Sequence, residues 1–235
     1  MKKTVILLFG GRSSEYEVSL SSAFGALENI DTEKYNVVKV GITRDGKFYL
    51  YEGENSLIPE NKWLAEGKCT PLSLDLEKGC FTAEDREIRP DAVLPMIHGK
   101  NCEDGTLQGM LTLMKIPVAG CGCTSSAVCM DKAFTKAIIN SETKINQAKA
   151  VVIRAEDYTP DTASSFREKC ERQLGYPVFV KPANAGSSVG VTKVKSAEDF
   201  DKAVKTALHE DEKVLVEEFI LGKEIEVAVL EEHGK

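Results

Sequence analysis

Residues 181–190 read Lys-Pro-Ala-Asn-Ala-Gly-Ser-Ser-Val-Gly, and the fold prediction starts from this stretch. Short apolar runs at 177–180 and 191–194 flank it and predict two β-strands, so the stretch is the tip of a hairpin. Its glycines allow backbone N–H groups to turn toward an anion, its serines add hydroxyl donors, and Lys181 adds a positive charge. These groups suit a phosphate-binding loop, although not a Walker A loop, because Gly-Lys-Ser/Thr is missing and no helix follows. Taken alone, however, the stretch favours an ordinary solvent-exposed hairpin loop.

The composition is that of a soluble globular protein with two compact units. The chain has 235 residues, of which 42% are hydrophobic and 29% are charged. A net charge of −7 argues against nucleic-acid binding by bulk electrostatics. The apolar run at the start is too short for a signal peptide, and no stretch is long enough to span a membrane. Seven cysteines without a zinc-binding spacing predict reduced thiols in a cytosolic protein.

The first half of the chain has the pattern of an open parallel α/β sheet. The predicted strands lie at 5–9, 35–42, 48–51 and 92–97, and the predicted helices at 14–29 and 106–114. Ser14 with Glu17 forms a capping box for the first helix, and Asp104 or Glu103 caps the second. Residues 52–87 show too little periodicity for any assignment.

The second half predicts a smaller α+β unit beyond a hinge at Gly120-Cys121-Gly122. Its predicted helices lie at 124–140, 161–174 and 196–208, the last opened by a Ser196/Asp199 capping box. Its predicted strands lie at 150–153, 214–220 and, as the start of a further hairpin, 224–230, in addition to the two that flank the loop. We expect domains at 1–121, 122–221 and 222–235, the third of them only begun.

Four motifs together are far more specific than any one of them. They occupy residues 10–20, 98–109, 126–132 and, in two pieces, 180–182 with 186–190. In this order they resemble the motifs of D-alanine–D-alanine ligases, and residues 41–46 resemble the branch that contains D-alanine–D-serine ligases of vancomycin resistance. The resemblance implies the ATP-grasp fold, an α/β class with an N-terminal Rossmann-like substrate domain and a central α+β domain.

The resemblance also implies the reaction. ATP phosphorylates the carboxylate of D-alanine, and the amine of a second D-amino acid, D-alanine or D-serine, attacks the D-alanyl phosphate, for peptidoglycan precursor synthesis. Phosphoryl transfer needs mainly positioning and charge neutralisation, which lysines and Mg²⁺ supply. The implied protein is cytoplasmic and often a homodimer, with D-amino acids as its partners and neither nucleic acid nor membrane.

The resemblance carries site residues onto matching positions of this chain. For ATP binding they are Lys132, Lys181, Ser187, Ser188, Glu217, Glu218, Phe219, Ile220 and Glu224. Glu15 matches the residue that holds the ammonium of the first D-alanine, and His98 the one beside its carboxylate. Ser187 matches the residue that orients Glu15 and closes the loop as a lid over the acyl phosphate.

Each of these residues also has a structural interpretation. Lys132 and Lys181 can be solvated surface charges, and the glutamates can belong to an acidic edge strand. Glu15 can be a partner of the helix dipole, although Glu17 is better placed for that role. His98 at a strand end can be purely structural.

Two features depart from the family pattern. Cys102 stands where the family has glycine, and it would be strained if that site needs a positive φ and neutral otherwise. The family's Mg²⁺ ligands, and the loop that selects the second substrate, are expected downstream of Lys235. We therefore expect an N-terminal portion of a ligase that is inactive in isolation.

Two other functions stay open. One is a different ATP-grasp enzyme that joins a carboxylate to an amine, and the other is a non-catalytic ATP-binding remnant without a metal site. The Gly10-Gly11 turn lacks Gly-x-Gly-x-x-Gly, which argues against a redox Rossmann protein.

Overall fold

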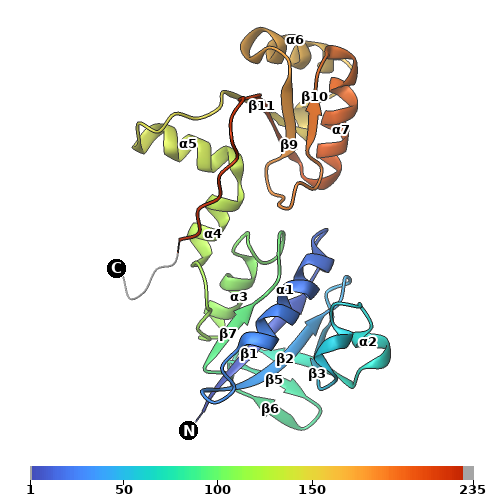
Figure 1. Cartoon of the computed structure of the whole chain (residues 1–235), viewed down its shortest axis with the longest axis vertical. Coiled ribbons are helices and arrows are strands. Elements are labelled where there is room, and N and C mark those ends of the chain that lie inside the picture. Colours follow the sequence, from blue (N-terminus) through green and yellow to red (C-terminus); the bar gives the residue numbers. More distant parts are fainter. Residues whose placement is uncertain (1, 230–235) are drawn as a thin grey trace.

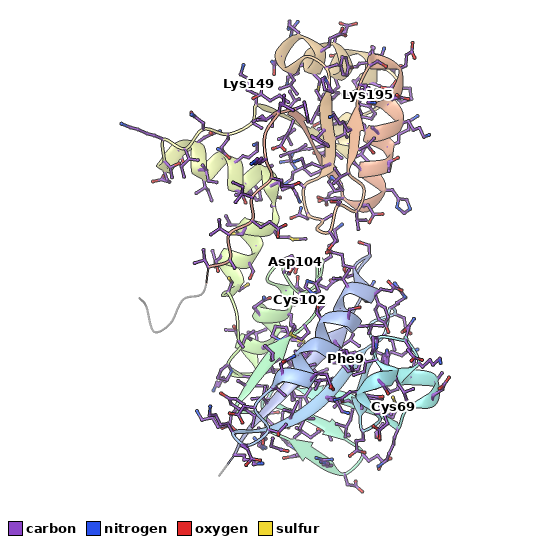
Figure 2. The ribbon with its side chains drawn as sticks, in the orientation of Figure 1. Phe9, Cys69, Cys102, Asp104, Lys149 and Lys195 are labelled. Atoms are coloured by element: carbon purple, nitrogen blue, oxygen red, sulfur yellow. The ribbon has the colours of Figure 1, made fainter. Side chains whose placement is uncertain are left out.

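The computed structural model describes residues 2–229, which fold into two α/β units joined end to end (Figure 1). We call residues 2–119 the N-terminal unit and residues 123–218 the central unit. Phe9 and Cys69 lie in the first, and Lys149 and Lys195 in the second (Figure 2). Among the residues described, no helix is both long and apolar enough to cross a bilayer.

The N-terminal unit is built on a seven-stranded sheet of order β6-β5-β4-β3-β2-β1-β7. Its strands are β1 (Lys3–Gly10), β2 (Tyr35–Ile42), β3 (Phe48–Tyr51), β4 (Cys69–Asp75), β5 (Cys80–Ala83), β6 (Arg86–Ile88) and β7 (Ala92–Pro95). Its helices are α1 (Tyr16–Asn29), α2 (Trp63–Glu66) and α3 (Thr106–Leu113), with a 3-10 turn η1 (Asn55–Leu57). Pairing is parallel across β2, β1 and β7 and antiparallel from β2 to β6, so the predicted parallel sheet has an antiparallel extension.

Strand β1 is a continuous apolar run because both of its faces are covered. Ile6 and Leu8 belong to one buried cluster, whereas Leu7 and Phe9 belong to another that also contains Trp63. All four strand residues are fully buried. Full burial of such a side chain stabilises the fold by about 1.5–3 kcal/mol, so this strand is a major source of the unit's stability.

Residues 52–87, unassigned from the sequence, form η1, α2 and three strands that widen the sheet. Trp63 holds them in place. Its ring packs edge-on against Phe9 and Tyr51, with ring centroids 5.1 Å and 6.1 Å apart. Its Nε1 donates to the hydroxyl of Tyr16 at 3.0 Å. Contacts between distant residues therefore fix this segment, and local periodicity does not report them.

The predicted capping box of the first helix is wrong. Helix α1 begins after Glu15, whose side chain makes no capping bond, and the hydroxyl of Ser13 instead accepts from the backbone N–H of Glu15 at 3.0 Å. Glu17 instead forms an ion pair with Arg44, which lies in the turn between β2 and β3. Asp104 does serve α3, because its carboxylate accepts from the N–H of Thr106 at 3.0 Å, although the N-cap residue itself is Gly105.

The central unit is a four-stranded antiparallel sheet of order β10-β9-β11-β8. Its strands are β8 (Ala150–Arg154), β9 (Val178–Pro182), β10 (Thr192–Val194) and β11 (Lys213–Glu218). Its helices are α4 (Cys123–Met130), α5 (Lys132–Glu142), α6 (Ala163–Leu174) and α7 (Phe200–Glu210), with the 3-10 turns η2 (Ala155–Asp157) and η3 (Ala197–Asp199). The predicted hairpin is confirmed, because Thr192 pairs with Val180 and the loop lies between β9 and β10.

Three element predictions in this unit are wrong. The helix at 124–140 is broken at Asp131, which is extended and caps α5 by accepting from the N–H groups of Ala133 and Phe134 at 2.9 and 3.1 Å. Ser196 makes no capping bond, because the turn η3 precedes α7. Residues 224–229 form no strand, since no described strand pairs with them, and the last residue of that predicted strand, Leu230, lies outside the described residues.

The reactivity of the cysteine thiols depends on how deeply each one is buried. Cys121, Cys123 and Cys129 are exposed, whereas burial raises the pKa of Cys102 and that of Cys170 to about 12. Cys80 is also buried. Because the reagent must reach the thiolate, we expect brief iodoacetamide treatment at pH 8 to modify the three exposed cysteines and to spare the three buried ones. Peptide mass spectrometry measures this labelling, and equal modification of all six would contradict their burial.

Candidate active site

The two faces of the central sheet have different chemistry. In an antiparallel pair, directly opposed residues point to the same face. Lys181 pairs with Leu215, and Phe179 pairs with Glu217, so these four side chains share one face. The intervening valines point the other way, into the core against α6 and α7. The face with Lys181 and Glu217 lies outside this core, and we call it the open face. Helix α5 covers part of it, because Leu215 is fully buried and lines a small cavity together with Ala133 and Lys136 of α5.

Glu217 is the charged centre of this open face. Lys181 is ion-paired with one of its carboxylate oxygens, and the Nζ of Lys136, from α5, lies 2.7 Å from the other. Burial alone would raise the pKa of Glu217, but the hydrogen bonds and charges of the two lysines outweigh burial, so its pKa is lowered. The carboxylate is thus an ionised hydrogen-bond acceptor at neutral pH.

Lys132 lies beside this pair at the start of α5. Its Nζ donates to the carbonyls of Ala185, at 2.5 Å, and Ala183, at 3.3 Å. Burial, and then the positive charge of Lys181, lower the pKa of Lys132. The two lysines predicted to bind phosphate therefore converge at the foot of the loop, and neither is a solvated surface charge.

A buried network that the sequence did not reveal holds this arrangement. The carboxylate of Asp131 pairs with Lys213 of β11, and both side chains are almost fully buried. The amide nitrogen of Asn184 donates to Asp211 at 3.0 Å and to Asp131 at 3.4 Å. The network joins α5, β11 and the first residues of the loop, so it fixes Lys132 relative to Lys181.

The loop closes onto the N-terminal unit through Glu15. The hydroxyl of Ser187 donates to Glu15 at 2.5 Å, and the N–H of Gly186 donates to it at 3.3 Å. Positive φ falls at Ser187 (45°), Ser188 (59°) and Gly190, and not at Gly186. Glycine at position 186 allows the close approach of Glu15, because a Cβ there would lie 2.9 Å from the carboxylate.

His98 lies next to Glu15 at the carboxyl end of β7. Its Nε2 is 2.8 Å from the hydroxyl of Ser22, and its Nδ1 is 3.6 Å from the carboxylate of Glu103. A Cβ on the next residue, Gly99, would lie 2.3 Å from the Glu15 carboxylate, so Gly99, with a φ of 74°, allows this segment to approach Glu15 closely.

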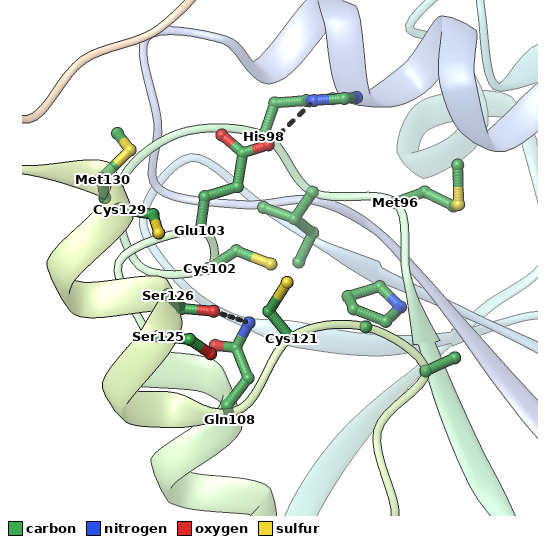
Figure 3. A pocket seen from close by; sticks show the side chains of 14 residues that line it. Met96, His98, Cys102, Glu103, Gln108, Cys121, Ser125, Ser126, Cys129 and Met130 are labelled. Atoms are coloured by element: carbon green, nitrogen blue, oxygen red, sulfur yellow. Dashed lines mark hydrogen bonds and ion pairs between the residues drawn. The ribbon is translucent and has the colours of Figure 1, made fainter. Parts of the chain in front are cut away.

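A cavity of about 410 Å³ opens beside His98, between the carboxyl end of β7 and helices α3 and α4 (Figure 3). Polar groups of Gln108 and Ser126 line it, and the Gln108 amide donates to the Ser126 hydroxyl at 3.3 Å. Cys102 also lines the cavity; the positive φ belongs to its neighbour Asn101, so cysteine at this position is not strained.

The far end of the open face is aromatic. The rings of Phe179 and Phe219 lie 5.9 Å apart at 49°, and the Nζ of Lys193 lies 3.5 Å above the Phe219 ring. The Glu218 carboxylate accepts from the backbone N–H of Lys149 at 2.8 Å, which ties β11 to β8. Ile220 and Glu224 are exposed on the irregular segment after β11, and no described contact brings them to Glu217.

A second cross-unit contact was missed from the sequence. Lys100, inside one of the predicted motifs, donates to the carbonyl of Glu210 at the end of α7, and its Nζ lies 3.7 Å from Asp211. Glu15 and Lys100 thus each join the N-terminal unit to the central unit, Glu15 at the loop and Lys100 at the end of α7.

Metal ligands do not gather in the described part of the chain. Across residues 2–229 no three His, Cys, Asp or Glu side chains form a cluster that could hold a metal ion. The donor set described here therefore does not fit the Mg²⁺ that the family resemblance implies, and the predicted ligands downstream of Lys235 lie outside the sequence.

The N-terminal unit has a mixed sheet with a crevice at the ends of its parallel strands. The central unit has an antiparallel sheet whose hairpin loop lies beside two converging lysines. Together these features define an ATP-grasp ligase architecture. Residues 4–121 match the family described as D-ala D-ala ligase N-terminus, and residues 139–235 match D-ala D-ala ligase C-terminus. The chain therefore belongs to the D-alanine–D-alanine ligase family.

Similar proteins agree with this family. A D-alanine–D-alanine ligase of Thermoanaerobacter sp. (strain X514) is 43% identical over 97% of this chain, and one of Clostridium novyi is 43% identical over 98%. The crystal structure of the VanG D-Ala:D-Ser ligase of Enterococcus faecalis is 40% identical over 94% of the chain, with a TM-score of 0.81. The D-alanine–D-alanine ligase of Coxiella burnetii has a TM-score of 0.82 at 30% identity, over 94% of this chain and 65% of its own. The chain spans 64% of the length of the first three.

Proposed function

We propose that this protein joins D-alanine to a second D-amino acid with ATP, through a D-alanyl phosphate, as a cytoplasmic enzyme of peptidoglycan precursor synthesis. The observation that carries the proposal is the contact of the buried Glu15 carboxylate with Ser187 and Gly186. It puts a carboxylate that can hold an ammonium directly beside a loop that can hold phosphate. A homodimer, as the family resemblance implies, belongs to the same proposal.

We assign the described residues to two groups, one that binds the first D-alanine and one that binds ATP. Glu15 binds the ammonium of the first D-alanine, because a carboxylate with two donors still has lone pairs free. His98 steadies negative charge on the substrate carboxylate as it attacks the γ-phosphate. Ser187, and the loop that carries it, exclude water from the acyl phosphate.

ATP binds on the open face of the central sheet. Lys132 and Lys181 neutralise its phosphates, with Ser188 as a further donor at the loop tip. Glu217 accepts from the adenine amine, and Phe219 with Ile220 covers the ring, while Glu218 lines the same strand end and Glu224 binds the ribose. Mg²⁺ would neutralise phosphate charge in addition, and none of these roles depends on it.

The second substrate is proposed to be D-alanine, with D-serine as the alternative that the likeness to a D-Ala:D-Ser ligase supports. Incubating the complete gene product with ATP, D-alanine and each candidate in turn, and identifying the dipeptide by mass spectrometry, distinguishes them. ADP release without any dipeptide would favour another carboxylate–amine ligase, and absence of turnover with intact ATP binding would favour the non-catalytic alternative.

Replacing Glu15 with glutamine tests the proposal directly. The amide oxygen still accepts from Ser187, so the loop stays closed, but a neutral group holds an ammonium poorly. We expect the KM for D-alanine to rise about 10- to 100-fold, since a hydrogen bond to a charged group contributes about 1.5–3 kcal/mol, while the Kd for ATP changes less than about 2-fold. The KM for D-alanine is measured from phosphate release by the complete gene product, and the Kd for ATP by calorimetry.

The exposed Glu17, replaced by glutamine in the same way, is the matched control and should change neither constant. Equal losses for D-alanine and ATP in the Glu15→Gln variant would show that Glu15 is structural.

A further inference from the structure

The Glu217 carboxylate has two lysine partners, and the proposed function uses only one of them. Lys181 binds one oxygen, and the Nζ of Lys136 lies 2.7 Å from the other. The side chain of Lys136 is 18% exposed and that of Glu217 is 12% exposed. Lys136 is therefore committed to this carboxylate and is not a solvated charge on the surface of α5.

Lys181 cannot serve Glu217 and a phosphate equally well. A phosphate at the loop carries more negative charge than a carboxylate and would draw the Lys181 ammonium toward it. Glu217 would then be left buried with a single close partner. Among the charged groups around it, Lys132 is held by the carbonyls of Ala183 and Ala185, and Lys193 lies over the Phe219 ring, so Lys136 is the lysine that stays on the carboxylate.

We propose that Lys136 is a positioning residue for the nucleotide base: it keeps Glu217 ionised and oriented when Lys181 moves to phosphate, and so makes the site select a purine with a 6-amino group. The inference rests on the proposed ATP site. Lys136 itself touches neither the base nor the phosphates and acts only through Glu217.

The selection follows from hydrogen-bond chemistry. An ionised carboxylate is an acceptor only, so it pairs with the 6-amino group of adenine and repels the 6-oxo group of hypoxanthine. A protonated carboxyl can donate to that oxo group, and the discrimination is then lost. Without Lys136, burial would favour the protonated form once Lys181 has left.

The test is a comparison of ATP with inosine triphosphate. Binding of each to the complete gene product is measured by calorimetry at pH 6 and pH 8, for the wild type and for Lys136→Met, Lys136→Arg and Lys205→Met. Methionine keeps the volume and removes the charge, arginine keeps the charge, and Lys205 is an exposed lysine of α7 that serves as the control. Thermal melting confirms that each variant is folded.

We expect the wild type to bind ATP about 10- to 100-fold more tightly than inosine triphosphate, the effect of one charged hydrogen bond, at both pH values. In Lys136→Met the preference should fall below about 3-fold at pH 6 and partly recover at pH 8, while Lys136→Arg and Lys205→Met keep the wild-type preference. A preference in Lys136→Met equal to that of the wild type at both pH values would overturn the inference and leave the proposed function intact. A wild type that binds neither nucleotide would instead overturn the proposed ATP site, and the inference with it.

Discussion

Replacement of Asp131 by alanine is expected to destabilise the central unit by about 3–5 kcal/mol, because it leaves the Lys213 ammonium buried without its partner. Loss of the helix cap adds about 1 kcal/mol, since two N–H groups of α5 lose their acceptor. Urea unfolding followed by circular dichroism measures the change. The single tryptophan, Trp63, lies in the N-terminal unit, so its fluorescence transition should move much less and serves as an internal control.

The matched variant is Lys213→Met, which removes the other charge. The double variant should be more stable than the sum of the two single changes predicts, because neither charge is then left unpaired. If the two single changes in the free energy of unfolding simply add in the double variant, Asp131 and Lys213 have no coupling energy.

The same ion pair gives a pH dependence. Burial alone would raise the pKa of Asp131, but the hydrogen bonds from Lys213 and the α5 backbone lower it below its ordinary value. A carboxyl whose pKa is lowered in the folded state stabilises the fold above its unfolded pKa, about 3.9. This stability is lost as the pH falls through the folded value, and in Asp131→Ala that acid dependence should be reduced.

Lys181→Met is expected to reduce phosphate release by the complete gene product about 10²- to 10³-fold, the usual cost of removing one preorganised electrostatic group at a transferring phosphoryl. Folding should be affected little, because Lys136 stays on Glu217. Steady-state phosphate release and the Kd for ATP measure the two effects separately.

Lys181→Arg should retain part of the activity, since the charge remains while its geometry changes. Lys195→Met removes an exposed lysine and should match the wild type. Activity of Lys181→Met within about 3-fold of wild type would mean that Lys181 serves only as a structural partner of Glu217.

The sequence was most informative where a short motif makes its own structure. The hairpin around residues 183–191 and the buried strand β1 follow from local patterns, and the fold class is confirmed by the family matches. The assignment of Lys132 to the phosphates came from the resemblance and stays a prediction. The pairing of Glu15 with Ser187 came from the resemblance alone, because 172 residues separate them.

What the sequence did not reveal depends on partners that lie far apart along the chain. Trp63 organises residues 52–87 through Phe9 and Tyr51, and no local period reports that contact. Lys136 meets Glu217 only because β11 lies beside β9 and α5 adjoins the open face. The break at Asp131 was hidden because the apolar spacing continues through it.

One overlooked signal was available. Successive side chains of a strand point to opposite faces, so Glu217 and Glu218 cannot both face one ligand from within β11. The structure uses the Glu218 carboxylate to hold the backbone of Lys149. Its contact with the nucleotide stays a prediction.

The alternation within β9 and β11 has a consequence for how this enzyme family can diversify. Val178, Val180, Val214 and Val216 form part of the core, and the residues between them lie on the opposite face. On β11 this opposite face is itself buried at Lys213 and Leu215, and Lys213 also forms the ion pair with Asp131, so changes there would alter folding as well as the site. On β9 the corresponding residues Phe179 and Lys181 are only half-buried, so this strand is where evolution can alter the site at the least expense in stability.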